Sequence, residues 1–186
     1  MKTLGLGTLE TLIAPIAQAV EDQRVDALGE ALATLCSRGV ITPQMFLPPR
    51  ADRYARNLLW RCPRSTFIVV AMTWAPGQGS PLHDHAGLWG AEIVIDGEMH
   101  ETVFDFAGKG ADGRFRFERG MHRRSRRGTL GLISPPKEYH NFGNAGSDVA
   151  HSLHVYSGEL STAHTYSEDA DGWWTARQVG LRYDAQ

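Results

Sequence analysis

Apolar residues recur every three or four positions over residues 9–17 and again over residues 25–37, with charged residues between them. This spacing places the apolar side chains on one face of an α-helix. Gly39 then supplies a helix stop, and prolines between residues 43 and 49 interrupt regular structure. The pattern predicts two helices, followed by a short helical piece over about residues 51–60. Because their apolar faces need a partner surface, we expect these helices to buttress a larger unit.

From about residue 66 the pattern changes to alternating apolar and polar positions and to short apolar runs, which are typical of β-strands. The Asp96-Gly97 pair is a hairpin signal, so the strand ending at Ile95 is predicted to pair with the strand beginning at Met99. Many short strands at regular spacing predict an all-β core, either a sandwich or a barrel. The expected strands cover residues 67–74, 89–95, 99–106, 115–117, 130–133, 149–156 and 182–183.

The length of 186 residues suits one domain over residues 1–186, with a helical segment over about 1–60 and a barrel over about 66–160. The formal net charge of −2 gives no electrostatic reason to expect nucleic acid. The basic run over residues 123–127 is expected to be a solvated loop between strands.

Two cysteines, Cys36 and Cys62, make no disulfide framework. The start of the chain lacks the apolar region of a signal peptide, and no apolar stretch approaches the roughly 18 residues that span a membrane. We therefore expect a cytoplasmic protein whose partner is a small molecule, with no binding to nucleic acid or to a membrane. The oligomeric state stays open.

The most informative chemistry lies in residues 77–85. His83 and His85 are one residue apart, so in an extended strand both imidazoles face the same side and can reach one metal ion. With Gly77 ahead and Gly97 behind, this pair resembles the first motif of the cupins, small jelly-roll barrels that bind a metal inside the barrel. The later segment Pro135-x4-His140-x3-Asn144 resembles the second cupin motif. The resemblance implies that His140 is the third ligand.

The glutamate of the first cupin motif is missing, because Trp89 and Gly90 occupy its place. Glu92 follows on the same strand, and we expect it to support the site rather than to bind the metal. Three neutral imidazoles leave a divalent metal its full positive charge, so such a site can accept an anionic thiolate beside dioxygen. Imidazole ligands suit iron, zinc, copper or nickel, so the ligands alone do not name the metal.

Four motifs together, spread over about residues 50–160, resemble the cysteine dioxygenase family of thiol dioxygenases. They are the His-x-His pair, the later histidine, the run Ser152-x-His154-x-Tyr156 and an upstream arginine segment. The resemblance implies a cupin double-stranded β-helix, which is a jelly-roll barrel. It also implies one Fe(II) per chain, O2 as co-substrate and a sulfinic acid as product.

The upstream segment contains Tyr54 and Arg56, and the resemblance implies that both bind the substrate. A guanidinium can hold a carboxylate through two parallel hydrogen bonds, which fixes the substrate's orientation. Ser152, His154 and Tyr156 alternate along one strand and so share a face, which favours a relay of hydroxyl, imidazole and phenol. A Ser-His-Asp hydrolase triad is not indicated, because no acid follows.

Mammalian-type members of that family carry a cysteine, cross-linked to the motif tyrosine, at the position of Gly90. Tyr156 is therefore expected to be unmodified. The surrounding residues look more like bacterial members, among them 3-mercaptopropionate dioxygenases, which place a glutamine where this chain has Arg56. We take conversion of L-cysteine to cysteine sulfinic acid as the leading hypothesis.

The alternatives are 3-mercaptopropionate and mercaptosuccinate, the latter needing a second anchor. A metal-dependent cupin isomerase, a hydrolase or a non-catalytic sensor represents a different class of function. Candidates for the second anchor are Arg53, Arg61 and Arg64, and the histidines expected to be bystanders are His100, His122, His151 and His164.

Overall fold

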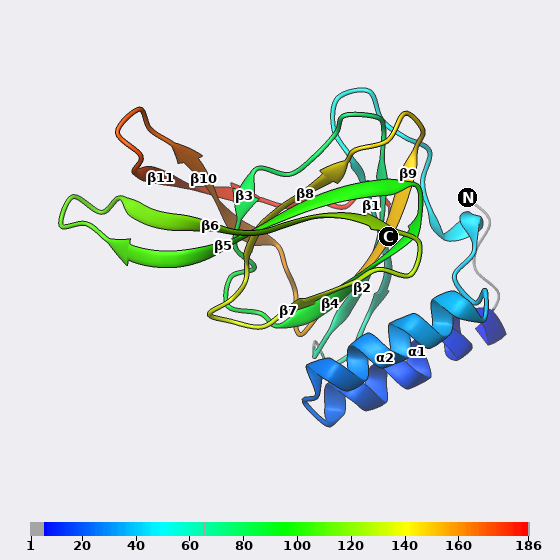
Figure 1. Ribbon diagram of the computed structural model, residues 1–186. Coiled ribbons are helices and arrows are strands. Elements are labelled where there is room, and N and C mark those ends of the chain that lie inside the picture. Colours follow the sequence, from blue (N-terminus) through cyan, green and yellow to red (C-terminus); the bar gives the residue numbers. More distant parts are fainter. Residues whose placement is uncertain (1–5, 65, 186) are drawn as a thin grey trace.

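Two β-sheets with a pair of helices against one of them make up the protein (Figure 1). The computed structural model describes residues 6–64 and 66–185. Helices α1 (Leu6–Glu21) and α2 (Val25–Ser37) are those that the apolar spacing predicts, and a short 3-10 helix, η1, covers Pro43–Met45. Helix α2 packs against strands β4 and β7.

The first sheet has five strands in the order β1-β2-β9-β4-β7, and the second closes on itself in the order β10-β11-β6-β5-β8-β3. The chain alternates between the sheets, which is the arrangement of a jelly-roll barrel and confirms the predicted fold class. The strands are β1 (Ala55–Arg61), β2 (Ile68–Trp74), β3 (Leu82–His83), β4 (Gly90–Asp96), β5 (Glu98–Lys109), β6 (Phe115–Arg126), β7 (Leu130–Ile133), β8 (Tyr139–Asn144), β9 (Ala150–Tyr156), β10 (Thr162–Glu168) and β11 (Trp174–Gly180).

The five-stranded sheet is buried on both faces, and alternation along each strand decides which face a side chain joins. On β2, Val69 and Ala71 pack in the cluster that includes the helices, while Val70 and Met72 pack in the cluster inside the barrel. Every residue of β2 is buried, which explains its unbroken apolar run. The same alternation on β4 and β9 aims their even-numbered residues into the barrel.

Several predictions made from the pattern are wrong. The expected helix over residues 51–60 is absent, because Ala55–Arg61 forms β1 and pairs with β2. Sheet pairing here overrides the local helical pattern. The expected hairpin at Asp96-Gly97 is also wrong: β4 pairs with β7 and β9, whereas β5 pairs with β6 and β8. Gly97, with φ of 80°, turns the chain from one sheet into the other.

The C-terminal third holds strands that the pattern did not predict. Strands β10 and β11 form a hairpin, while the expected strand at residues 182–183 does not form. The chain there runs instead beside β1, where Ala185 makes a bridge to Asn57. The basic run 123–127 is not a loop, since its first four residues end β6. No helix among residues 6–64 and 66–185 is long and apolar enough to cross a membrane.

Candidate metal centre

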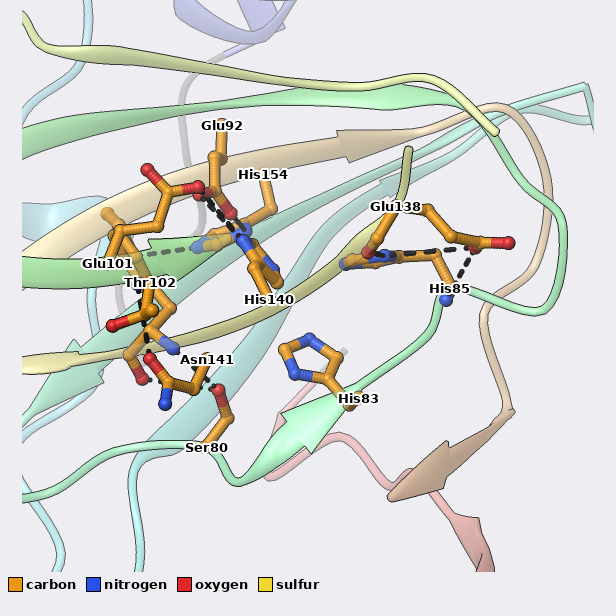
Figure 2. Close-up of polar contacts among 12 residues, drawn as sticks. Ser80, His83, His85, Glu92, Glu101, Thr102, Glu138, His140, Asn141 and His154 are labelled. Atoms are coloured by element: carbon orange, nitrogen blue, oxygen red, sulfur yellow. Dashed lines mark hydrogen bonds and ion pairs between the residues drawn. The ribbon is translucent and has the colours of Figure 1, made fainter. Parts of the chain in front are cut away.

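Three histidine side chains converge inside the barrel (Figure 2). His83 ends β3, His85 follows just beyond it, and His140 lies on β8 directly across from His83. One nitrogen from each ring lies within 4.8 Å of the others, and the ring centroids are 4.8–5.0 Å apart. Ala86, with φ of 53°, bends the chain after the pair. The structure thus brings together the three residues that the two motifs indicate.

Backbone carbonyls fix the orientation of the first two rings. Nδ1 of His83 lies 3.0 Å from the carbonyl oxygen of Pro81, and Nδ1 of His85 lies 3.0 Å from that of Glu138. A carbonyl only accepts, so each Nδ1 carries the proton and each Nε2 keeps a lone pair. Nε2 of His85 is buried and has no hydrogen-bond partner in the described part of the chain. A metal ion would satisfy it.

Burial keeps these rings neutral, which is the form that binds a metal. Desolvation, with the neighbouring His140, lowers the pKa of His83 to about 3. Desolvation and the other two rings hold the pKa of His85 well below its usual value. Protons therefore do not compete for these two nitrogens near neutral pH.

A carboxylate orients the third ring. Nδ1 of His140 lies 3.1 Å from Oε1 of Glu101, whose other oxygen lies 2.7 Å from the guanidinium of Arg123. Burial alone would lower the pKa of His140, but the charge of Glu92 and the hydrogen bond to Glu101 raise it. Because Nδ1 of His140 donates its proton in a hydrogen bond to Glu101, the His140 ring also offers Nε2 as a ligand. The donor set therefore fits a metal ion.

Glu92 is a buried carboxylate on β4, which lies between β9 and β7 in the five-stranded sheet. Its Oε2 lies 3.1 Å from Nδ1 of His154, and its Oε1 lies 3.8 Å from Nδ1 of His140. Opposite it on β7 stands Gly131, where a Cβ would come within 2.8 Å of the Glu92 side chain. Glu92 therefore faces the Nδ1 side of His140, away from the converging Nε2 atoms. One carboxylate links a candidate ligand to the β9 relay.

The relay residues on β9 are hydrogen-bonded in series. The Trp74 indole donates to Ser152 Oγ at 2.9 Å, and Oγ lies 2.7 Å from Nε2 of His154. Nδ1 of His154 lies 3.1 Å from both Tyr156 OH and the carboxylate of Glu92. The carboxylate must receive the Nδ1 proton, so Nε2 accepts the proton of Ser152. The phenol of Tyr156 then keeps its own proton free to donate.

Burial, together with the charge of Glu92, raises the pKa of Tyr156, so its phenol stays protonated. Tyr156 lines a cavity of ≈ 100 Å³ that is also lined by Tyr54, Arg56, His83 and His140. Arg56 is only 3% exposed, and its Nη1 has no hydrogen-bond partner among the described residues. An anion entering the cavity would supply that partner.

The four expected bystander histidines lie outside this cavity. His164 nevertheless has a structural partner next to the site, because its Nδ1 lies 2.9 Å from Oδ2 of Asp84. Asp84 stands between His83 and His85 and also accepts the hydroxyl of Tyr166 at 2.9 Å. Nothing in the local sequence signals this link, since its two ends are 80 residues apart.

The jelly-roll barrel is the fold of a cupin, and the three histidines gathered inside it fit a metal cofactor. More narrowly, a model of the family described as cysteine dioxygenase type I matches residues 4–169, and the chain belongs to that family. Cysteine dioxygenase type 1 from Rattus norvegicus is 27% identical over 117 residues, which cover 62% of this chain and 56% of the relative. The Danio rerio protein of the same name is 25% identical over 169 residues, covering 87% and 80%. The chain thus spans little more than half the length of several relatives.

Solved structures with a similar trace include a Klebsiella pneumoniae protein described as having a double-stranded beta-helix domain. It has a TM-score of 0.48 and 18% identity, and the match covers 64% of this chain and 90% of that one. The Thermus thermophilus protein TT1209 gives a TM-score of 0.48 with 15% identity, covering 63% and 95%.

Proposed function

We propose that this protein is an Fe(II)-dependent thiol dioxygenase that adds both atoms of O2 to the sulfur of a small carboxylated thiol. The leading candidate reaction is conversion of L-cysteine to cysteine sulfinic acid. The observation that carries the proposal is a single cavity lined by His83, His140, Tyr156 and Arg56. Nη1 of Arg56 has no hydrogen-bond partner among the described residues. Membership of the cysteine dioxygenase type I family supports it. The reaction RSH + O2 → RSO2H balances without a further reductant.

We propose that His83, His85 and His140 hold one Fe(II) per chain through Nε2. When bound, Fe(II) supplies a Lewis acid that favours the thiolate and a redox-active centre for dioxygen. The histidine set would accept zinc, copper or nickel as well, so the support for iron comes from the family. Glu92 and Glu101 add negative charge on the far side of the His140 ring.

Arg56 would orient the substrate. A carboxylate placed against its guanidinium makes two charge-assisted hydrogen bonds, worth about 1.5–3 kcal/mol. This contact would hold the sulfur in a fixed direction within the cavity, and such positioning lowers the barrier by proximity. Tyr54, stacked on Trp74 with ring centroids 4.2 Å apart, forms a rigid apolar wall of the same cavity.

Tyr156 would donate its phenolic proton toward the reacting group or the substrate carboxylate. His154 holds the phenol in place, and Ser152 with Glu92 fixes the imidazole. Because burial keeps the phenol protonated, it acts as a hydrogen-bond donor across the neutral pH range.

The arginines considered as a second anchor favour a thiol with one carboxylate. Three of them are already paired with acidic residues: Arg53 with Asp184, Arg61 with Glu159 and Arg64 with Glu21. Within the described residues, none of these three lines the cavity. A dicarboxylate such as mercaptosuccinate would therefore lack a second anchor.

3-Mercaptopropionate is the second candidate substrate, and one observation favours it. The only carboxylate among the described cavity-lining residues is Glu92, which is engaged by His154. Its Oε1 has no hydrogen-bond partner among the described residues but lies 3.8 Å from Nδ1 of His140, so the ammonium group of cysteine would compete with two imidazoles for this carboxylate. 3-Mercaptopropionate carries no ammonium group. Both substrates use the same anchor at Arg56.

The test is oxygen uptake by protein purified without oxygen and analysed for metal. Cysteine, 3-mercaptopropionate, mercaptosuccinate and cysteamine are compared in wild type and in Arg56→Gln. Glutamine removes the positive charge and the two parallel hydrogen-bond donors of the guanidinium. Catalytic efficiency for carboxylated thiols should therefore fall by roughly ten- to a hundredfold. Cysteamine, which has no carboxylate, should lose little. Arg64→Gln, at a residue away from the cavity, is the matched control.

Equal losses on cysteamine and on carboxylated thiols would make Arg56 structural. A wild-type preference for mercaptosuccinate would overturn the substrate assignment while keeping the anchor. Zinc or manganese at full occupancy with no oxygen uptake on any thiol would reject the dioxygenase in favour of a hydrolase, isomerase or sensor.

A further inference from the structure

Among the described residues, the buried guanidinium of Arg56 has no ion-pair partner, although Tyr183, whose ring contacts it, is hydrogen-bonded to the carboxylate of Glu159. Within residues 6–64 and 66–185, no carboxylate oxygen comes within 4.0 Å of its nitrogens. Such an arrangement is costly, because a buried charge is normally paired. The hydrogen bonds from Arg61 and Tyr183 lower the pKa of Glu159, and the positive charge of Arg56 lowers this pKa further. Other contacts must therefore prevent the carboxylate of Glu159 from pairing with the guanidinium of Arg56.

Two side chains hold Glu159 in place. Arg61 donates to it twice, from Nε at 2.7 Å and from Nη2 at 3.3 Å. The hydroxyl of Tyr183 donates to Oε1 at 2.9 Å. Both carboxylate oxygens are therefore occupied by donors other than Arg56.

The ring of Tyr183 is a spacer in this cluster. Its centroid lies 5.0 Å from Cζ of Arg56 and 5.9 Å from Cζ of Arg61, so it contacts both guanidiniums. A neutral aromatic ring can cover a cation without taking its hydrogen-bond donors. Arg56 is thus sheltered while its Nη1 stays free.

The chain after β11 runs beside β1 (Figure 1), where Ala185 makes a bridge to Asn57. Asp184 accepts the backbone N–H of Arg56 at 2.9 Å, and its own N–H donates to the carbonyl of Arg56 at 2.8 Å. Its carboxylate also pairs with Arg53. Tyr183 is therefore held to the same backbone that carries Arg56.

We propose that Glu159 is a specificity-determining residue: Arg61 and Tyr183 hold its carboxylate away from Arg56, which leaves the guanidinium free for the single carboxylate of a small thiol. This rests on the proposed role of Arg56 as the substrate anchor. The consequence is a competition between an internal carboxylate and the substrate carboxylate for one guanidinium. The Arg61–Glu159 pair sets its outcome, although neither residue lines the cavity.

The experiment releases Glu159 and then neutralises it. Arg61→Met keeps an apolar stem but frees the carboxylate, which should turn to Arg56 and weaken binding of carboxylated thiols by about five- to twentyfold. The double variant Arg61→Met/Glu159→Gln removes the competing charge and should bind within about twofold of wild type. Arg64→Met, which breaks an exposed pair elsewhere, is the matched control.

Two readouts separate this inference from the proposed function. Calorimetric binding of propionate and of 3-mercaptopropionate to the metal-loaded protein without oxygen tests the anchor even if no thiol is oxidised. Oxygen uptake then gives KM and kcat, with the change expected in KM for carboxylated thiols and not for cysteamine.

Unchanged binding in Arg61→Met would overturn the proposal, and so would a loss that Glu159→Gln fails to rescue, since that would be a structural effect. Loss and rescue of propionate binding in a protein that oxidises no thiol would support the competition and reject the dioxygenase. Thermal unfolding of all variants checks that each is folded.

Discussion

Gly90 gives the clearest quantitative prediction, because a side chain at this position has nowhere to go. The residue opens β4 and pairs with Tyr156 on β9 and with Ile133 on β7. A Cβ there would overlap the carbonyl oxygen of Val155 and lie 3.2 Å from the Cα of Tyr156. Both are backbone atoms of a central strand, so neither can move aside cheaply.

The expected cost of Gly90→Ala follows from that contact. Overpacking a core typically costs about 1–3 kcal/mol, and a backbone clash lies at the upper end of that range. For a domain of this size, about 1 kcal/mol corresponds to roughly 2–4 °C in Tm. We therefore expect Tm to fall by about 6–12 °C, measured by calorimetry on the metal-loaded protein.

Gly180→Ala is the matched control, since Gly180 also lies on a strand but a Cβ there meets no atom within 4 Å. Its Tm should stay within about 2 °C of wild type. A comparably small change in Gly90→Ala would refute the steric reasoning. The same clash predicts that Gly90→Cys destabilises the protein instead of creating the cysteine–tyrosine cross-link of mammalian-type relatives.

Three further predictions concern the site. His140→Ala should lose most bound iron and all oxygen uptake, and stoichiometric iron in that variant would contradict the ligand assignment. Tyr156 should be unmodified, so intact-mass analysis should give the sequence mass, and a species two mass units lighter that maps to Tyr156 would count against this. Glu92→Gln should keep its metal but lower kcat by roughly tenfold, because an amide holds His154 less firmly than a carboxylate. Equal effects of Glu101→Gln on kcat would show that contact with His154 is irrelevant.

The local sequence pattern was sufficient to predict features that depend on a single helix or strand. The apolar stripe of each N-terminal helix needs only a surface to cover, and both helices form where the spacing predicts them. The even spacing of Ser152, His154 and Tyr156 on a strand was likewise enough to predict that they share a face, and hydrogen bonds join them.

Long-range pairing was beyond the reach of local pattern. Asp96-Gly97 looks like a hairpin turn, but the closure of the barrel decides that β4 and β5 enter different sheets. The support that Glu92 gives His154 depends on strands far apart in sequence meeting in register. A carboxylate within the apolar run of β4 was the one available signal, and it does not say which partner it meets.

The position of Tyr183 beside Arg56 had no sequence signal, because a single aromatic residue near the end of the chain carries no pattern. The sequence predicts the relay of Ser152, His154 and Tyr156. The contact of Glu92 with His154 and that of Tyr183 with Arg56 arise only from the three-dimensional fold.

Because side chains alternate between the two faces of β9, the register of this one strand determines both the stability of the core and the chemistry of the site. Leu153 and Val155 point to the helix layer, while Ser152, His154 and Tyr156 point into the barrel. A shift of the strand register by one residue would move the imidazole of His154 and the phenol of Tyr156 into the apolar core. It would turn Leu153 and Val155 toward the site inside the barrel. A change of register in β9 would therefore cost the core packing and the chemistry together. Insertions and deletions in β9 should therefore be absent from any functional descendant of this chain, however freely its loops vary.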